Sequence, residues 1–351
     1  MMQSNPILGT LLHAIGGVSA SSCYTPQSKI KNWSWGTFWL VQASFAWIIA
    51  PFLLGWLTVP GFFQILATAP GDVFWGAFLL GGLYGFGGMS FGLAIKHIGY
   101  SLTYTIAIGI SAVLGTLAPL LLKGTLIEYF SRSGSTIIGS GMVLSVIGVA
   151  LCGWAGFRKE RDLEKLGSGA FKFNMSTGLV LAIIGGVLSA VFNISLEHGQ
   201  LIADMAAQNG AGVFEGNAKM IVSTSGCFVV NFVWFIVLGI KDKTLKEFTV
   251  SAELTANTLI KNTLWSALAG VMWCTQFLFY GLGHVQMGRF QFISWVLHMS
   301  MLIFFSYGIG VIMKEWKNVS RKTYTTLLIA LITLMISFVV MTVGSYIGEQ
   351  V

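Results

Sequence analysis

Residues 327–341 read Leu-Leu-Ile-Ala-Leu-Ile-Thr-Leu-Met-Ile-Ser-Phe-Val-Val-Met, and they lie inside a longer apolar region, Thr323–Ile347. A bilayer core of about 30 Å requires about 20 mainly apolar residues in a helix. A strand of a membrane barrel would instead alternate apolar and polar residues, which this run does not. Because every backbone polar group in hydrocarbon needs an internal partner, the run predicts a transmembrane helix.

Nine more stretches of this kind occupy most of the remaining chain. Only 9% of the 351 residues are charged and 55% are hydrophobic, so little polar sequence separates the stretches. We therefore predict an all-α polytopic membrane protein with ten transmembrane helices. The predicted spans are Pro6–Pro26, Trp35–Thr58, Val73–Ile95, Tyr100–Leu122, Thr136–Gly156, Gly178–Glu197, Asn217–Ile240, Asn262–Val285, Phe290–Met313 and Thr323–Ile347.

The composition argues against several classes of function. The polar segments are too short for a soluble catalytic domain, so an enzyme is not expected. The net charge of +7 is typical of the basic loops that orient membrane proteins, and no soluble basic face for nucleic acid accompanies it. Cys23, Cys152, Cys227 and Cys274 lie in four different spans without metal-ligand spacing. We expect them to be buried apolar thiols, with no disulfide, metal or cofactor.

Lysine and arginine are distributed unevenly between the loops. Of the 20 such residues, 16 follow odd-numbered spans and 4 follow even-numbered spans. The positive-inside rule places the basic loops in the cytoplasm. With ten spans, both termini are then predicted to lie on the opposite, periplasmic side of the membrane. No charge precedes Pro6, so we expect the first helix to be retained rather than cleaved as a signal peptide.

An even division of the spans predicts two five-helix halves, 1–156 and 178–351, joined by a cytoplasmic loop at 157–177. An odd number of spans per half inverts the second half relative to the first. Such inverted repeats are typical of secondary transporters, whose binding site lies near the membrane midplane.

Short sequence patterns support such a repeat. Tyr84 precedes Phe91-Gly92 at the spacing with which Trp273 precedes Tyr280-Gly281. Gly16–Ala20 in the first span also resembles Gly185–Ala190 in the sixth. The third span contains the pairs Gly81/Gly85 and Gly88/Gly92, a spacing that predicts close approach of neighbouring helices.

Ionisable residues inside the spans are costly and are therefore candidates for a functional role. His13, His284 and His298 lie in or at the edge of spans, and Glu197 ends the sixth span. Imidazole has an ordinary pKa of about 6.5, which suits it to take up and release a proton near neutral pH. We predict these four residues as proton-coupling candidates, with His13 and His298 preferred because each lies within a span.

Two spans each present aromatic, amide and imidazole groups on one face. In the eighth span Trp273, Gln276, Tyr280 and His284 follow a helical spacing, as do Gln291, Trp295 and His298 in the ninth. A sugar fits this mixture, because its hydroxyls need fixed polar partners and its C–H face packs on a ring. We predict a sugar site. Its members are Trp273, Gln276, Tyr280, Gln291, Trp295 and the mid-span Asn231.

For several of these residues a structural role is the alternative. Trp273, Gln276 and Tyr280 would then serve interhelical packing, and Asn231 and His13 would bond a neighbouring helix. His284 would be a residue that reaches from a span end toward the membrane surface.

The chain resembles the L-rhamnose–proton symporter family. The resemblance is carried by Gly270-Val-Met-Trp-Cys-Thr-Gln-Phe-Leu-Phe-Tyr-Gly-Leu-Gly-His284, by Phe292-Ile-Ser-Trp-Val-Leu-His-Met-Ser300, by Lys314-Glu-Trp-Lys-Asn318 and by Lys31-Asn-Trp-Ser-Trp35. The pattern from His13 through Tyr24 adds to it, and the similarity extends over essentially the whole chain.

The resemblance implies proton-driven import of a deoxyhexose, with L-rhamnose as the expected sugar, by a member of the drug/metabolite transporter superfamily with two inverted five-helix halves. Gln291 stands where an acidic residue is expected, which leaves the exact sugar open and keeps sodium as the alternative coupling ion. Many ten-span members of the superfamily are drawn with cytoplasmic termini, whereas the loop charges here indicate the opposite. The alternative functions are a metabolite or drug exporter, a membrane-embedded enzyme and a non-transporting sensor.

The loop charges generate a prediction about topology. A phosphatase, which is active only in the periplasm, is expected to be active when fused at Val351 and inactive when fused in the 157–177 loop. A fluorescent protein, which is active only in the cytoplasm, is expected to show the reverse. The reason is that 16 of 20 basic residues lie in the odd-numbered loops. Paired phosphatase and fluorescent-protein fusions measure this. Phosphatase activity at the loop with none at Val351 would reverse the orientation.

Overall fold

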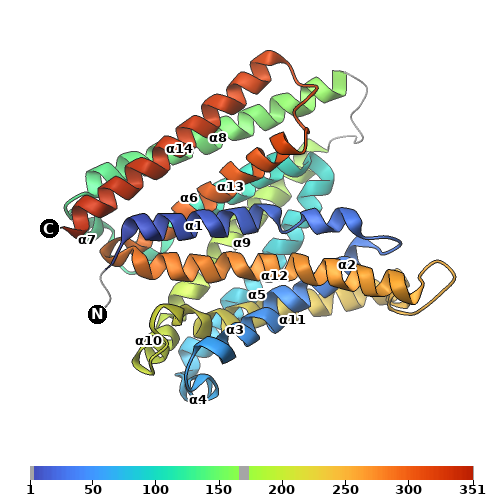
Figure 1. The fold of residues 1–351 in the computed structure, drawn as a ribbon, viewed down its shortest axis with the longest axis horizontal. Coiled ribbons are helices and arrows are strands. Elements are labelled where there is room, and N and C mark those ends of the chain that lie inside the picture. The colour runs from blue at the N-terminus through green and yellow to red at the C-terminus, as the bar shows by residue number, and fades with distance from the viewer. Residues whose placement is uncertain (1–3, 166–173, 351) are drawn as a thin grey trace. The chain divides into compact units, whose positions relative to one another are not determined.

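A computed structural model describes residues 4–165 and 174–350, and every regular element in these ranges is helical (Figure 1). The chain forms two compact units, of which unit 1 is built from three separate segments and unit 2 from two. Unit 1 takes Met1–Ser21, Gly87–Ile194 and Leu282–Val351, and unit 2 takes Ser22–Phe86 and Ser195–Gly281. Each unit therefore takes helices from both of the halves predicted from the sequence.

The helices divide between the units; α5, α9 and α12 are shared between both, and α1 crosses the boundary with its last residue only. Those of unit 1 are α1 (Pro6–Ser22, whose last residue is in unit 2), α6 (Tyr100–Leu122), α7 (Leu126–Phe130), α8 (Ser135–Lys165), η5 (Gly288–Ile293), α13 (Ser294–Ile312) and α14 (Arg321–Glu349). Those of unit 2 are η1 (Thr25–Lys29), α2 (Trp35–Ser44), η2 (Phe45–Ile49), α3 (Ala50–Thr58), α4 (Phe62–Thr68), α10 (Gln200–Gln208), η3 (Gly212–Phe214), α11 (Gly216–Lys241) and η4 (Thr244–Phe248). The chain passes from one unit to the other within α5 (Gly71–Ile98), α9 (Met175–His198) and α12 (Ala256–Gln286).

All ten predicted spans fall on helical segments. Within the described ranges, nine of these segments are long and apolar enough to cross a membrane. The predicted span Asn262–Val285 is not among the nine, although it lies inside α12, an unbroken helix of 31 residues. Its polar residues, among them Asn262, Gln276 and His284, lower its apolar character.

The loop predicted at 157–177 is helical at both of its ends. Helix α8 continues to Lys165 and α9 begins at Met175, while residues 166–173 lie outside the described residues. Most of residues 158–165 are Arg, Lys, Glu and Leu, which are good helix formers, so the polar sequence after the fifth span extends the helix instead of ending it.

In unit 2, α5 packs against α11 with the two backbones close together. A methyl group on Gly81 would overlap the Ser223 carbonyl oxygen, and one on Gly226 would overlap the Phe78 carbonyl oxygen. The thiol of Cys227 donates to the Gly81 carbonyl oxygen at 3.1 Å. The glycine spacing of the third span therefore serves close helix approach here, as the sequence predicts.

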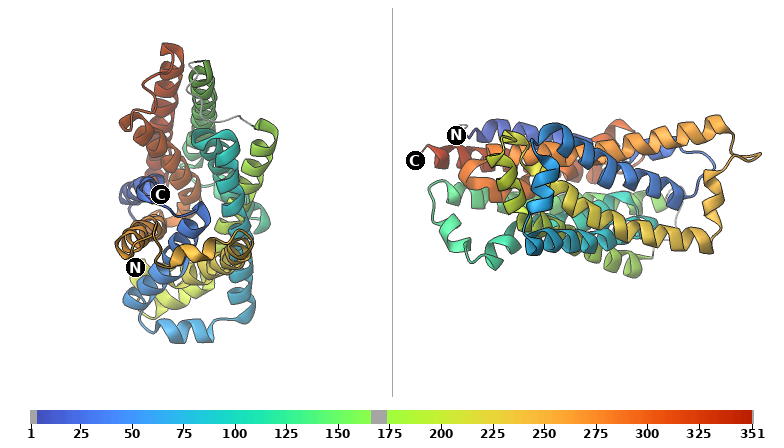
Figure 2. Two further views of the ribbon diagram at one scale, coloured as in Figure 1. Left: turned by 90° about the vertical axis from the view of Figure 1, so that its right-hand side faces the viewer. Right: turned by 90° about the horizontal axis from the view of Figure 1, so that it is seen from below.

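In unit 1, α8 and α14 run side by side, as both Figure 1 and Figure 2 show. Gly141 and Gly148 of α8 lie against Met341 and Leu334 of α14. At one end of the pair, the Asp162 carboxylate accepts from the Thr323 hydroxyl at 2.7 Å and from the Ser320 N–H at 2.9 Å. The helices are thus antiparallel, and a carboxylate fixes their register.

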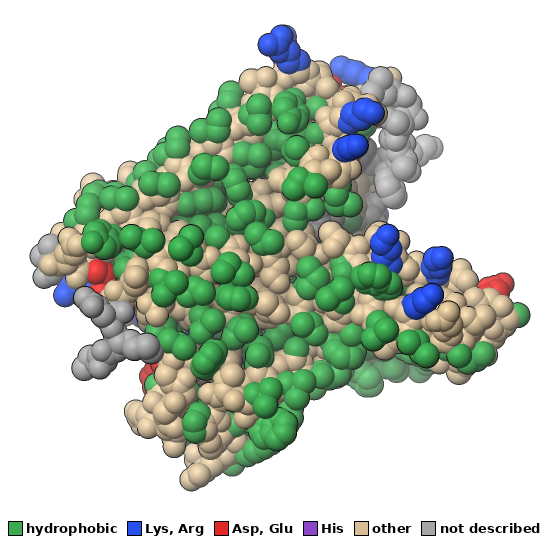
Figure 3. Space-filling model, in the orientation of Figure 1, with side chains coloured by type: hydrophobic (Ala, Val, Ile, Leu, Met, Phe, Trp, Pro, Cys, Tyr) green, Lys and Arg blue, Asp and Glu red, His purple; other side chains and the backbone are tan. Residues whose placement is uncertain are grey.

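The same end of unit 1 holds a buried cation. Lys159 is 5% exposed, and its Nζ lies 2.9 Å from Glu315 Oε2 and 5.0 Å from the centre of the Trp316 ring. Lys and Arg side chains gather at this end of the α8–α14 pair in Figure 3, whereas hydrophobic side chains cover much of the rest of the visible face. Such an apolar surface suits a helix pair that faces lipid.

The close contact of α5 with α11 generates a prediction about stability. Gly81→Ala is expected to lower stability by about 1–3 kcal/mol, because the added methyl forces the two backbones apart. Gly308→Ala on α13 is the matched control, since no atom beyond its own stretch of helix lies within 4 Å of an added Cβ there. Thermal melting of the detergent-purified variants measures the difference. Equal melting temperatures would show that the α5–α11 contact is looser than described.

Candidate functional site

Unit 2 contains a cluster of buried aromatic rings built around α12. The ring centroid of Trp273 lies 4.9 Å from that of Phe277, 5.7 Å from that of Trp47 and 6.5 Å from that of Tyr84. Tyr280 continues the cluster, 6.1 Å from Phe277. The cluster brings together α5, the η2 turn and α12, and it supplies flat apolar faces in the interior of a helical unit.

The predicted eighth-span stripe lies on one continuous helix. Trp273, Gln276, Tyr280 and His284 are all buried on α12, the last of them in unit 1. Glu197, in the last turn of α9, is half-buried and interacts electrostatically with Tyr280. The structure therefore brings one predicted carboxylate close to the predicted sugar stripe.

Asn231 connects three helices through its amide. Its Oδ1 accepts from Trp39 Nε1 at 3.0 Å, and its Nδ2 donates to the Gly85 and Cys227 carbonyl oxygens at 3.0 and 2.9 Å. These bonds join α2, α5 and α11 and occupy both ends of the amide. The arrangement favours the structural alternative for Asn231 over the predicted contact with sugar.

Two of the three predicted polar side chains of the ninth span lie on α13, in unit 1. The Trp295 indole is 1% exposed, and its Nε1 donates to the Ser111 carbonyl oxygen at 2.9 Å. A methyl group on Gly115 would overlap the same indole. Trp295 therefore holds α13 against α6. The third side chain, Gln291, is half-buried in η5.

Three histidines approach one another in unit 1. The ring centroids of His13 on α1 and His298 on α13 are 5.8 Å apart with an interplanar angle of 68°, and both residues are fully buried. His13 interacts electrostatically with His284 as well as with His298. A methyl group on Gly283 would lie 3.0 Å from His13 Nε2, so α12 reaches His13 only because that position is glycine.

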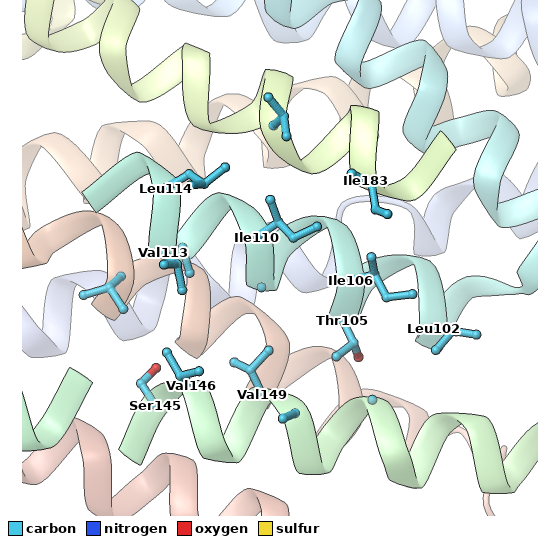
Figure 4. A pocket seen from close by; sticks show the side chains of 16 residues that line it. Leu102, Thr105, Ile106, Ile110, Val113, Leu114, Ser145, Val146, Val149 and Ile183 are labelled. Carbon is cyan, nitrogen blue, oxygen red and sulfur yellow. The ribbon is translucent and has the colours of Figure 1, made fainter. Parts of the chain in front are cut away.

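Unit 1 also contains a pocket of about 800 Å³ between α6, α8 and α9 (Figure 4). Its lining is almost wholly Leu, Ile, Val, Ala and Gly, and it includes none of the predicted site residues. The two polar exceptions have partners, since the Thr105 hydroxyl bonds Tyr307 at 2.7 Å and the Ser145 hydroxyl bonds Ser300 at 2.5 Å. The pocket is therefore poorly suited to a polyhydroxylated ligand.

Comparison with known proteins agrees with these features. The family model of the L-rhamnose-proton symport protein (RhaT) matches residues 2–346. The chain belongs to the RhaT family. Proteins named L-rhamnose-proton symporter are 34% identical to it in Pectobacterium carotovorum subsp. carotovorum strain PC1 and 32% identical in Shigella dysenteriae serotype 1, each over 97% of this chain and 99% of the relative. A protein of that name in Mannheimia succiniciproducens is 30% identical over 96% of this chain and 97% of its own.

Membership of the RhaT family identifies a transporter rather than an enzyme. Together with the apolar helices, it supports a multi-pass protein of the bacterial inner membrane. The family confirms the resemblance found in the sequence.

Several residues of the aromatic cluster were not predicted as site residues. Trp47 and Tyr84 contact Trp273 directly, and Trp39 packs on Trp47 at 6.2 Å. Tyr84 did carry a signal, because the repeated pattern pairs it with Trp273, and the structure stacks the two rings at an interplanar angle of 23°. The only sequence signal at Trp47 was its position in the middle of a span, four residues before Pro51.

Proposed function

We propose that the protein imports L-rhamnose together with protons across the bacterial inner membrane. The observation that carries the proposal is the match of residues 2–346 to a symporter family, with relatives of that name at 30–34% identity along nearly the whole chain. The buried aromatic and amide groups on α12 are chemically suited to a sugar, and the histidines of unit 1 are suited to a proton.

The proposed architecture has ten spans in two inverted five-helix halves, as in the drug/metabolite transporter superfamily. Helix α12 supplies the tenth span, because 31 residues extend about 46 Å at 1.5 Å per residue, well beyond a bilayer core. The stacking of Tyr84 on Trp273 supports the repeat, since equivalent positions of inverted halves meet near the central axis.

The proposed orientation places both termini in the periplasm. In unit 1, the bonds from Asp162 to Ser320 and Thr323 bring the basic end of α8 to the basic start of α14. In unit 2, the Lys31 backbone and the Asn262 amide exchange two hydrogen bonds of 3.1 and 2.7 Å, which join the lysine-containing loop before α2 to the start of α12, next to Lys261. Each unit thus concentrates basic residues at one end, as expected of a cytoplasmic face.

The proposed sugar contacts are Trp273, Gln276 and Tyr280. A deoxyhexose has hydroxyl groups, which need polar partners in a dry site, and a C–H face and methyl group, which pack on aromatic rings. Gln276 and Tyr280 supply the polar groups and Trp273 supplies the ring. Gln291 remains a proposed contact, whereas the bonds of Asn231 and Trp295 favour roles in holding helices together.

Uptake of radiolabelled L-rhamnose by transport-deficient cells tests the function and the stripe together. Gln276→Ala and Tyr280→Phe are expected to weaken apparent affinity about 5- to 150-fold, because a lost hydrogen bond to a buried hydroxyl costs about 1–3 kcal/mol. The control is Thr275→Ala, a half-buried neighbour on α12 whose hydroxyl bonds its own helix. Unlabelled sugars added in competition define the substrate.

If cells that express the wild-type protein take up no L-rhamnose, the proposed function is wrong. If the wild type transports but both variants match it at equal expression, Gln276 and Tyr280 belong to helix packing instead.

The proposed proton site is the histidine cluster of unit 1, with Glu197 of unit 2 as a further candidate. The 5.8 Å separation of the His13 and His298 rings makes simultaneous protonation unfavourable, because two like charges in an apolar interior repel each other. The pair is therefore suited to hold one proton at a time. One charge crossing 100 mV supplies about 2.3 kcal/mol, enough for a substantial sugar gradient.

His13→Gln and His298→Gln are each expected to abolish uphill accumulation while sparing exchange of internal for external sugar, because glutamine bonds but does not titrate. His198→Gln, at an exposed position at the end of α9, is the control and should accumulate sugar normally. Accumulation is measured with and without an uncoupler, and again in sodium-free buffer. Accumulation that survives the uncoupler but requires sodium would replace the proton by sodium as the coupling ion.

A further inference from the structure

A buried indole N–H without a partner lies inside unit 2. Trp47 is 3% exposed, and no described residue accepts a hydrogen bond from its Nε1. Two other tryptophans of the same unit have partners, since Trp39 donates to Asn231 and Trp33 donates to the Glu247 carbonyl oxygen at 2.9 Å. An unbonded donor in the interior costs stability, so a polar partner of Trp47 is expected from outside the chain.

An acceptor without a partner lies five residues earlier. Gln42 is also 3% exposed, and its Oε1 receives no hydrogen bond from a described residue. One unmatched donor and one unmatched acceptor thus occur within a single short segment. A ligand hydroxyl, which both donates and accepts, matches this combination.

The segment between them departs from regular α-helix. Residues Phe45–Ile49 form the π-turn η2, in which the Ala50 N–H bonds the Phe45 carbonyl oxygen five residues back. Single π-turns within α-helices are found frequently at functional sites, because the extra residue shifts the side chains that follow it. Pro51 lies two residues after the end of the turn and has no N–H of its own to leave unbonded.

The π-turn lies against the proposed sugar stripe. Gly270 of α12 faces it, and an added methyl there would overlap the Gln42 carbonyl oxygen and lie 2.7 Å from the Phe45 Cβ. Trp273, one turn further along α12, meets the Trp47 ring nearly edge-on, at 5.7 Å and 83°. The contact at Gly270 therefore brings η2 close to the residues already proposed to bind sugar.

The orphan hydroxyls elsewhere are less informative. Thr103, Thr116 and Ser294 in unit 1 also bury oxygens without a partner, but a hydroxyl hydrogen rotates to suit its surroundings. The indole N–H has a single fixed direction, and buried tryptophans usually satisfy it. Trp47 is thus the stronger indicator of a ligand.

We propose that Trp47 and Gln42 are sugar-binding residues: the Trp47 N–H donates to one hydroxyl of the pyranose, and the Gln42 side-chain oxygen accepts from another. The rings of Trp47, Tyr84 and Trp273 surround the apolar part of the same ligand, which for a deoxyhexose includes its methyl group. This proposal rests on the proposed function, which it extends from α12 to the first half of the chain.

Isothermal titration of detergent-purified protein with L-rhamnose tests the proposal. Trp47→Phe keeps a ring and removes the N–H, and Gln42→Met keeps the length and removes the acceptor. Each is expected to weaken binding about 5- to 150-fold. Gln42→Met is expected to leave the melting temperature of the sugar-free protein unchanged, because no internal bond is lost, whereas Trp47→Phe is expected to lower it slightly through the smaller ring in the buried cluster. Trp56→Phe, on the lipid-exposed side of α3 at 55% exposure, is the matched control and should bind as the wild type does.

Deoxy analogues of rhamnose identify the hydroxyl that is bound. The analogue that lacks the hydroxyl bound by Trp47 is expected to bind the wild type more weakly than rhamnose does. It is expected to bind Trp47→Phe as strongly as rhamnose does, because that variant has no N–H to lose. Unchanged affinity in both variants overturns the proposal, as does a loss of affinity in Gln42→Met matched by a fall in its melting temperature, which would mark a structural role. Absence of rhamnose binding by the wild type would instead refute the proposed function, so the two failures are distinguishable.

Discussion

The requirement that polar groups in hydrocarbon find a partner within the protein governs this structure. It makes every regular described element a helix, and it applies equally to polar side chains between helices. Asn231 shows the rule at work, because both ends of its amide are bonded to neighbouring helices. Against this background, a buried polar atom without a partner marks a place where something other than the chain is expected to bind.

Close helix approach depends on glycine, and these close contacts determine where the aromatic and histidine side chains come together. Gly81 and Gly226 let α5 and α11 meet, Gly270 admits the π-turn beside Trp273, and Gly283 makes room for His13. The aromatic cluster and the histidine cluster therefore both depend on close helix contacts at glycine. Helix α12 carries members of both, with Tyr280 and His284 separated by about 6 Å of helix rise, a direct covalent connection between the proposed sugar contacts and the proposed proton site.

The sequence was informative wherever a feature repeats along one element. The stripe of Trp273, Gln276 and Tyr280 follows from helical spacing alone, and the structure places it buried on one helix. Spacing does not reveal which partner a polar group has already found. Asn231 and Trp295 have the composition expected of a sugar site, yet each is bonded to residues far away in the chain.

By itself, the sequence determined that the protein lies in a membrane, that it is helical and which family it resembles, because hydropathy and motifs are local properties of the chain. Tertiary structure alone decided that His13 meets His298, that Tyr84 stacks on Trp273 and that Trp47 retains an unbonded N–H. Each of these depends on contacts between residues distant in the chain. The π-turn at Phe45–Ile49 is likewise visible only in the tertiary structure, where it packs against α12 at Gly270.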